Sequence, residues 1–274
     1  MDLLKQSIDM AALYEKNPKV KAILLAGSVS KNLQDEHSDI ELHILWSIPP
    51  TDHERKSPIE QINGTILSYH AYEDEEWSEA YLTRDGVKFE ISSFLVETVE
   101  RFVSDVVDQH DTDYDKQCII ASIHDGVSLC GEEKISEWKN RVAAYPSELT
   151  ERMISENLWL GNRWNNREAL LKRQDWLMLY DVLCGVQMKL FGVLFGLNRM
   201  YVHHPVFKWM ENNIERMEIK PENLHARMNK TWIGDPASGV KELEGLIEEV
   251  MELVEEYHPG LDISEQKNSI EYVK

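Results

Sequence analysis

The spacing of the apolar residues changes near Glu97, and this change limits the possible folds of the chain more than any other feature. Before Glu97, short apolar runs with a period of two alternate with runs of helical spacing. After it, apolar residues recur every three to four positions, as they do in helices. We therefore expect an α+β fold, in which an N-terminal mixed sheet flanked by helices is followed by a C-terminal α-helical bundle.

The length of 274 residues suits two domains of roughly 100 to 150 residues each. Pro146 marks the expected boundary, because it separates a polar stretch ending at Tyr145 from a long helical pattern that begins near Ser147. The predicted domains are therefore residues 1–145 and 146–274.

The local patterns predict the main elements of both domains. In the first domain they indicate a helix over residues 3–15 and strands over 21–26, 39–46, 65–72 and 87–95. The proline-rich stretch 49–58 and the acidic stretch 73–79 are interpreted as connections between these strands. In the second domain the patterns predict helices near 147–173, 175–197, 203–217 and 238–257.

The charge of the chain limits its partners. The sequence has 49 Asp and Glu against 29 Lys and Arg, so the formal net charge is −20. Such a surface repels phosphate backbones and anionic lipids, which makes long nucleic acids and membranes poor candidate partners. Cationic or neutral small molecules fit this charge better.

The cysteines and the hydropathy pattern bear on the location of the chain. Cys118, Cys130 and Cys184 are odd in number and have no CxxC spacing, so we expect a reducing cytoplasm. The N-terminal residues have no secretion-signal pattern. The apolar stretch 176–198 contains Asp181 and Lys189, so a buried bundle helix is expected there.

Chemistry is concentrated in residues 24–45. A buried strand runs into Gly27-Ser28, a stretch of helical polarity follows, and the next strand carries Asp39 and Glu41. Side chains two residues apart on a strand share one face and lie about 6 to 7 Å apart. Two carboxylates so placed can hold one or two divalent cations. The glycine allows a ligand to approach the backbone closely, and the serine can contact phosphate oxygens.

Glu90 is the expected third acid. It lies in the strand pattern of residues 87–95, on the face shared with Lys88 and Ser92. Each feature alone has a simpler explanation, because a Gly-Ser pair is usually a turn and Asp-x-Glu is usually the solvent face of a sheet. The three features in this order and spacing favour a site.

These residues resemble a known family. Gly27-Ser28 followed by Asp39-Ile40-Glu41-Leu42 is similar to the signature of nucleotidyltransferases of the DNA polymerase β superfamily. The resemblance is closest to the small bacterial branch with a helical C-terminal domain, which includes kanamycin- and streptomycin-type antibiotic nucleotidyltransferases. In the second domain it is looser, and rests on residues 197–201 and 207–209.

The resemblance implies Mg²⁺-dependent transfer of a nucleoside monophosphate from ATP or another nucleoside triphosphate to an acceptor hydroxyl. It implies catalytic and metal-binding roles for Asp39, Glu41 and Glu90, and phosphate-binding roles for Gly27, Ser28 and Lys208. A surface lysine is the alternative interpretation of Lys208. The chain departs from the pattern twice: many relatives have a glycine where it has residues 31–33, and an aspartate where it has Glu41.

Three functions remain open at this stage. The first is transfer to a small molecule such as an aminoglycoside-like antibiotic, which the negative charge would attract. The second is transfer to a protein side chain or an RNA end. For RNA, the one basic candidate region is formed by Arg163, Arg167, Lys172 and Arg173. The third is a nucleotide-binding protein without turnover.

Several other residues have a functional and a structural interpretation. Asp181 and Glu168 can serve as acceptor-binding groups or as polar caps of helices, and the latter is preferred. Helical spacing favours packing over base stacking for four tryptophans, Trp159, Trp164, Trp176 and Trp209. The adjacent His203-His204 lacks the spacing of a metal site.

Overall fold

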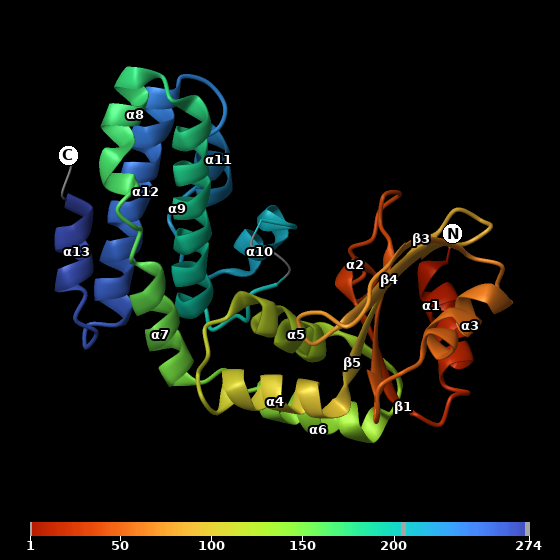
Figure 1. Ribbon diagram of the computed structural model, residues 1–274. Coiled ribbons are helices and arrows are strands. Elements are labelled where there is room, and N and C mark those ends of the chain that lie inside the picture. Colours follow the sequence, from red (N-terminus) through yellow and green to blue (C-terminus); the bar gives the residue numbers. More distant parts are fainter. Residues whose placement is uncertain (1, 204–206, 272–274) are drawn as a thin grey trace. The chain divides into compact units, whose positions relative to one another are not determined.

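The computed structural model describes residues 2–203 and 207–271. The chain divides into two compact units, residues 1–109 with 116–144, and residues 110–115 with 145–274. The first unit contains a mixed sheet with helices and the second is helical, so the fold class is α+β as predicted (Figure 1). The segment His110–Asp115 belongs to the second unit, whereas the sequence placed it in the first.

The first unit is built on a six-stranded sheet of order β3-β4-β5-β2-β1-β6. The pair β2 and β5 is parallel and the other neighbours are antiparallel. The strands are β1 (Val20–Ala26), β2 (Ile40–Trp46), β3 (Thr65–Tyr69), β4 (Trp77–Leu82), β5 (Lys88–Leu95) and β6 (Val127–Cys130). The helices are α1 (Leu3–Tyr14), α2 (Gly27–Ser30), α3 (Asp52–Gln61), α4 (Val96–Val107), α5 (Tyr114–Asp125) and α6 (Glu132–Val142).

Helices cover both faces of this sheet (Figure 1). On one face, α1 and α3 pack on Ile40, Leu42 and Ile44 of β2 and on their neighbours in the core. On the other face, side chains of α4, α5 and α6 surround His43 and Phe94. The strict alternation of residues 39–46 therefore places apolar side chains against α1 and α3, and Glu41 and His43 on the opposite face.

The strands β4 and β6 and the helix α3 of the first unit were missed by the sequence interpretation, which expected only helical structure around β6. The stretch around Pro50 and Pro58 forms α3, because Thr51 and Glu54 make a capping box that starts the helix ahead of Pro58. The acidic stretch 73–79 leads into β4, and Glu79 on that strand is buried rather than solvated.

A buried ion pair ties α3 to β4. Arg55 and Glu79 are 1% and 2% exposed, and the Arg55 Nε donates to Glu79 at 2.9 Å. The Arg55 guanidinium also donates to the carbonyl oxygens of His70 and Ser78 and stacks on the Tyr69 ring. Burial raises the pKa of Glu79, and the guanidinium offsets part of this rise.

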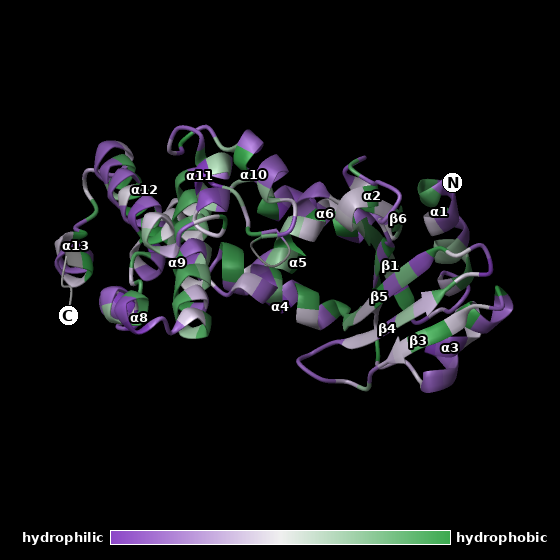
Figure 2. Cartoon of the chain, turned by 90° about the horizontal axis from the view of Figure 1, so that it is seen from above, coloured by the Kyte–Doolittle hydropathy of each residue, from purple (hydrophilic) through white to green (hydrophobic). Residues whose placement is uncertain are grey.

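The second unit is a bundle built around the 22-residue helix α9. Its helices are α7 (Ser147–Asn157), α8 (Arg167–Arg173), α9 (Trp176–Leu197), α10 (Met210–Arg216), α11 (Leu224–Lys230), α12 (Pro236–Tyr257) and α13 (Ser264–Glu271), with a 3₁₀ turn η1 (Trp164–Asn166). Apolar positions are concentrated on α9 and alternate with polar ones on α12 (Figure 2). Length and composition alone make α9 a candidate membrane span, but 56% of its most apolar window is buried inside the structure.

Two of the helices predicted for the second unit differ in the structure. The pattern 147–173 is broken between α7 and α8, where Gly161 has a φ of +83° that no helix contains. The helix predicted over 203–217 is confined to Met210–Arg216 among the described residues, and residues 204–206 lie outside them.

We predict that Glu79→Gln lowers the free energy of unfolding by about 3 kcal/mol, because it leaves the buried Arg55 guanidinium without a counter-charge. Urea denaturation measures the change. The control is Asp9→Asn, which breaks the exposed Lys5–Asp9 pair and should leave stability almost unchanged. Equal effects of the two substitutions would contradict the assigned role of the Arg55–Glu79 pair.

We also predict that stability contributed by Glu54 is lost in acid. The Lys19 ammonium and the Thr51 backbone N–H hold the pKa of Glu54 at about 2, below its usual value of 4.5. Because the pKa is lower in the folded state, the contribution is complete above about pH 4.5 and disappears as the pH falls toward 2.

The corresponding variant is Glu54→Gln, which should cost about 1 kcal/mol at pH 7 through loss of the charged cap. The difference from the wild-type protein should shrink between pH 4.5 and 3 in urea unfolding. Glu60→Gln, at an exposed position of the same helix, is the control. A difference that stays constant over this range would contradict the cause assigned to the pKa.

Candidate functional site

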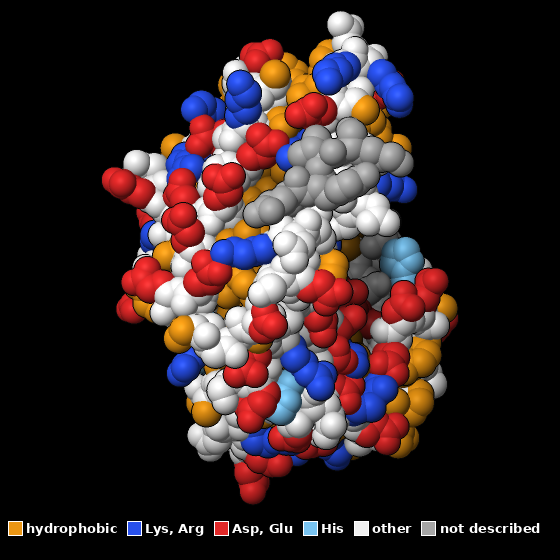
Figure 3. Space-filling model, turned by 90° about the vertical axis from the view of Figure 1, so that its left-hand side faces the viewer, with side chains coloured by type: hydrophobic (Ala, Val, Ile, Leu, Met, Phe, Trp, Pro, Cys, Tyr) orange, Lys and Arg blue, Asp and Glu red, His pale blue; other side chains and the backbone are white. Residues whose placement is uncertain are grey.

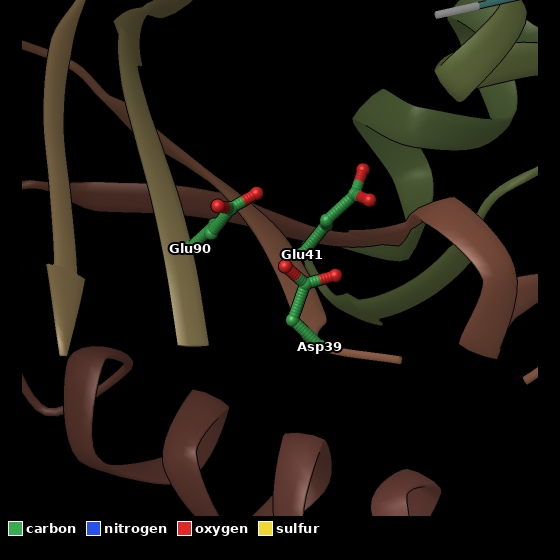
Figure 4. A group of neighbouring side chains, drawn as sticks. All are labelled: Asp39, Glu41 and Glu90. Atoms are coloured by element: carbon green, nitrogen blue, oxygen red, sulfur yellow. The ribbon is translucent and has the colours of Figure 1, made fainter. Parts of the chain in front are cut away.

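The three acids singled out from the sequence converge in the first unit. Asp39 directly precedes β2, Glu41 lies on β2 and Glu90 lies on β5. Each offers one carboxylate oxygen, and these oxygens all lie within 4.8 Å of one another (Figure 4). All three side chains are half-buried, so solvent still reaches the cluster.

The pairing of β2 with β5 places these acids together. Glu41 and Glu90 are partners in the parallel register, and Ile40 pairs with Phe89. Asp39 shares the face of Glu41 because the two are separated by one residue of extended chain. On the other side of β2, Glu41 pairs with Ala26, the last residue of β1. The site therefore lies where β1 ends and β2 begins.

Gly27 makes room for Glu41. A Cβ atom at position 27 would lie 2.6 Å from the Cδ of Glu41 and 2.7 Å from its Oε1. The φ of Gly27 is +67°, a left-handed conformation that side chains disfavour. The predicted glycine turn is thus adjacent to the acids. Position 27 requires glycine for a steric reason, in addition to the expected close approach of phosphate.

The loop between Gly27 and Asp39 is compact. The predicted helical stretch is only one turn, α2, and Ser28 within it is 8% exposed. Asn32 follows with a φ of +55°, so asparagine takes the left-handed conformation in this loop. Asp35 then receives hydrogen bonds from the Ser38 hydroxyl and the His37 backbone N–H, which fixes the chain just before Asp39.

The sequence interpretation gave Lys88 no role, although it placed this residue on the face of Glu90. The Lys88 Nζ donates to Asp39 Oδ2 at 3.2 Å and also to Glu90 Oε1. The hydrogen bond to Glu90 raises the pKa of Lys88. A positively charged ammonium therefore bridges two of the three carboxylates.

His43 lies on the same face, one pair of residues further along β2. Its ring packs against Phe94, and both ring nitrogens are buried without a hydrogen-bond partner among the described residues. Burial lowers the pKa of His43 to about 4, so the ring is neutral at pH 7. An uncharged ring therefore lies next to the acids on this face, and the Lys88 ammonium contacts Asp39 and Glu90.

The residues of the cluster fit a divalent metal ion. Carboxylate oxygens are the ligands that hard cations such as Mg²⁺ prefer. Three carboxylates this close repel one another, and a bound cation removes that repulsion. The space kept open by Gly27 lets the Glu41 carboxylate take its place in the group.

The other residues considered in the sequence lie in the second unit. Lys208 is exposed in the turn before α10, and its phosphate contact stays a prediction. Asp181 and Glu168 are exposed and form ion pairs with Arg163 and Lys172.

Trp164 is buried, as a packing residue would be. Trp159, Trp176 and Trp209 are each about two-fifths exposed. His204 lies outside the described residues, and His203 Nε2 is 3.1 Å from Arg216 Nη1.

Comparison with protein families gives one match. A model described as "Domain of unknown function (DUF4037)" matches residues 112–210, about a third of the chain. The matched segment runs from just before α5 to the first residue of α10, so it leaves out Asp39, Glu41 and Glu90. Among curated proteins, no match is found.

Several solved structures are similar to the chain, and they include the following two. A nucleotidyltransferase-like protein from Exiguobacterium sibiricum 255-15 is 10% identical with a TM-score of 0.44, and the alignment covers 92% of this chain and 77% of that one. An aminoglycoside 6-adenyltransferase from Bacillus subtilis is 11% identical with a TM-score of 0.36, and the corresponding shares are 96% and 95%. Both names fall in the class that the sequence resembles. Because both identities and both scores are low, we base the function on the side chains of this chain.

We predict that Gly27→Ala weakens Mn²⁺ binding at least tenfold, because the added methyl group displaces the Glu41 carboxylate. Calorimetric titration with Mn²⁺ measures the change. Gly86→Ala is the matched control: its φ is +82°, but a Cβ there meets nothing within 4 Å. Both variants should lose about 1 kcal/mol of stability from backbone strain. Unchanged Mn²⁺ affinity in Gly27→Ala would contradict the steric role.

Proposed function

We propose that the chain transfers a nucleoside monophosphate from ATP or another nucleoside triphosphate to a hydroxyl group of a small molecule. The observation that carries this proposal is the convergence of Asp39, Glu41 and Glu90 beside the Gly27 turn. Enzymes that transfer phosphoryl groups act mainly by positioning and charge neutralisation. A cluster of carboxylates can hold the cations that neutralise charge, and the adjacent backbone turn can position the phosphates.

The chain's own residues divide this work. Asp39 and Glu41 hold the divalent cations, which we take to be Mg²⁺, and Glu90 completes the ligand set. When bound, such ions would neutralise the negative charge that develops during transfer. The Gly27 and Ser28 turn lies beside Glu41 and contacts the β- and γ-phosphates.

The proposed reaction is a single displacement at the α-phosphorus. The acceptor oxygen forms a bond to the α-phosphorus as the bond to the oxygen bridging to the β-phosphorus breaks, and pyrophosphate leaves with that bonding pair. The acceptor hydroxyl proton passes to the Glu90 carboxylate. With 43% of its side chain exposed, Glu90 is accessible to an acceptor that arrives from solvent.

The charge of the chain favours a cationic acceptor. Acidic side chains are spread over the surface drawn in Figure 3, in keeping with the net charge of −20. Such a surface attracts a polyamine sugar of the aminoglycoside type and repels RNA. Three of the basic residues considered for RNA binding, Arg163, Arg167 and Lys172, are in ion pairs with Asp181, Glu244 and Glu168. Their charges are thereby largely neutralised.

We predict that Asp39→Asn lowers Mg²⁺-dependent nucleotidyl transfer at least 100-fold, because it removes one ligand charge without changing the size of the side chain. The assay follows release of pyrophosphate from each of the four nucleoside triphosphates, with a panel of aminoglycosides and lincosamides as acceptors. Glu60→Gln, on the exposed side of α3, serves as the control and should keep full activity.

The other outcomes of this assay separate the alternatives. Label from α-³²P-ATP that enters protein or RNA of a cell extract, with none in small molecules, would replace the proposed acceptor by a macromolecule. Tight ATP binding without Mg²⁺ dependence and without pyrophosphate release would instead indicate a binding protein. A cytoplasmic location is proposed with the function, because Cys118, Cys130 and Cys184 are all free thiols.

A further inference from the structure

We propose that Lys88 is a built-in counter-ion of the acidic cluster, which a divalent cation must displace in order to bind. This inference rests on the proposed function, since it concerns the same three carboxylates. It assigns to Lys88 a direct influence on metal affinity. Its ammonium bridges Asp39 and Glu90, the two acids contributed by different segments of the chain.

The position of Lys88 follows from the sheet. Lys88 and Glu90 are two residues apart on β5 and therefore share a face. Because Ile40 pairs with Phe89 in the parallel register, Asp39 comes next to Lys88 at the same end of the sheet. The side chain of Lys88 is thus directed at the acids by the pairing that assembles them.

The ammonium and a metal ion need the same carboxylates. A divalent cation bound by Asp39, Glu41 and Glu90 draws on oxygens that all lie within 4.8 Å of one another. Lys88 Nζ already contacts Asp39 and Glu90, and two cations so close repel each other strongly. Metal binding therefore requires the ammonium to move away. The loss of its contacts with Asp39 and Glu90 makes the free energy of metal binding less favourable.

Lys88 is able to move. Its side chain is 40% exposed, and a lysine ammonium is a flexible, strongly hydrated group that water accepts readily. Its backbone pairs with Leu82 in the sheet, so displacement of the side chain leaves the strand pairing intact. The cost of displacement is that of a partly exposed ion pair with two carboxylates, which is modest.

The test is the Mn²⁺ affinity of the full chain without nucleotide, measured by calorimetry and by electron paramagnetic resonance. Lys88→Met, which keeps the length of the side chain and removes its charge, should bind Mn²⁺ about tenfold more tightly than the wild-type protein. Lys88→Arg keeps a positive charge at this position and should bind Mn²⁺ about as weakly as the wild-type protein. Lys21→Met makes the same change in net charge at an exposed position near the other end of β1, so its affinity should rise less than twofold.

Two further results would separate the failure of this inference from that of the proposed function. If Asp39→Asn abolishes Mn²⁺ binding but Lys88→Met binds like the wild type, the acids hold metal and the counter-ion role of Lys88 is wrong. An equal gain of affinity in Lys21→Met would also overturn it, since net charge alone would then account for the effect. If neither the wild type nor Lys88→Met binds Mn²⁺, both the inference and the proposed function fall.

Discussion

The parallel pairing of β2 with β5 is the constraint on which the site depends. It makes Glu41 and Glu90 neighbours although they are 49 positions apart in the sequence, and it brings Asp39 beside Lys88. Side chains alternate along a strand, so a shift of the register by one residue would turn Glu90 toward α1 and α3. The apolar alternation of both strands prevents this shift, because it would bury Lys88 and Glu90 in the core.

Three carboxylates at one end of a sheet repel one another electrostatically. Solvent and neighbouring side chains offset part of this repulsion. Half-burial leaves the carboxylates partly hydrated, and the Lys88 ammonium neutralises part of their charge. On the opposite face of the sheet, the Arg55–Glu79 pair fixes β4, which is the neighbour of β5. The carboxylates therefore lie at one end of the two central strands, β5 and β2, and β5 pairs with the strand that the ion pair fixes.

Much of this arrangement was predictable, because alternation and spacing are local properties of the sequence. The faces of β2 and β5, the position of the Gly27 turn and the grouping of the three acids all follow from such patterns. β4 was missed because the acids before it suggest a solvated connection, whereas Glu79 is buried by a partner 24 residues away. α3 was missed because a capping box outweighs the prolines around it.

The remaining differences arise from contacts between distant parts of the chain. Lys88 has the pattern of any lysine on the polar face of a strand, and only the parallel register shows that Asp39 lies within its reach. The steric need for Gly27 likewise depends on where the Glu41 carboxylate lies. In the second unit, the break after α7 occurs at Gly161, and periodicity alone does not distinguish a broken helix from a continuous one.

The neutral ring of His43, whose two nitrogens are buried, has a consequence for the electric field of the acids. Behind Glu41 and Glu90 the sheet is covered by an uncharged imidazole and by apolar side chains, which form a medium of low polarizability. Field lines from the carboxylates then concentrate on the solvent side, as they do above a charged rim with a low-dielectric wall. A cation diffusing nearby is attracted to the ends of β2 and β5, where solvent reaches the carboxylates.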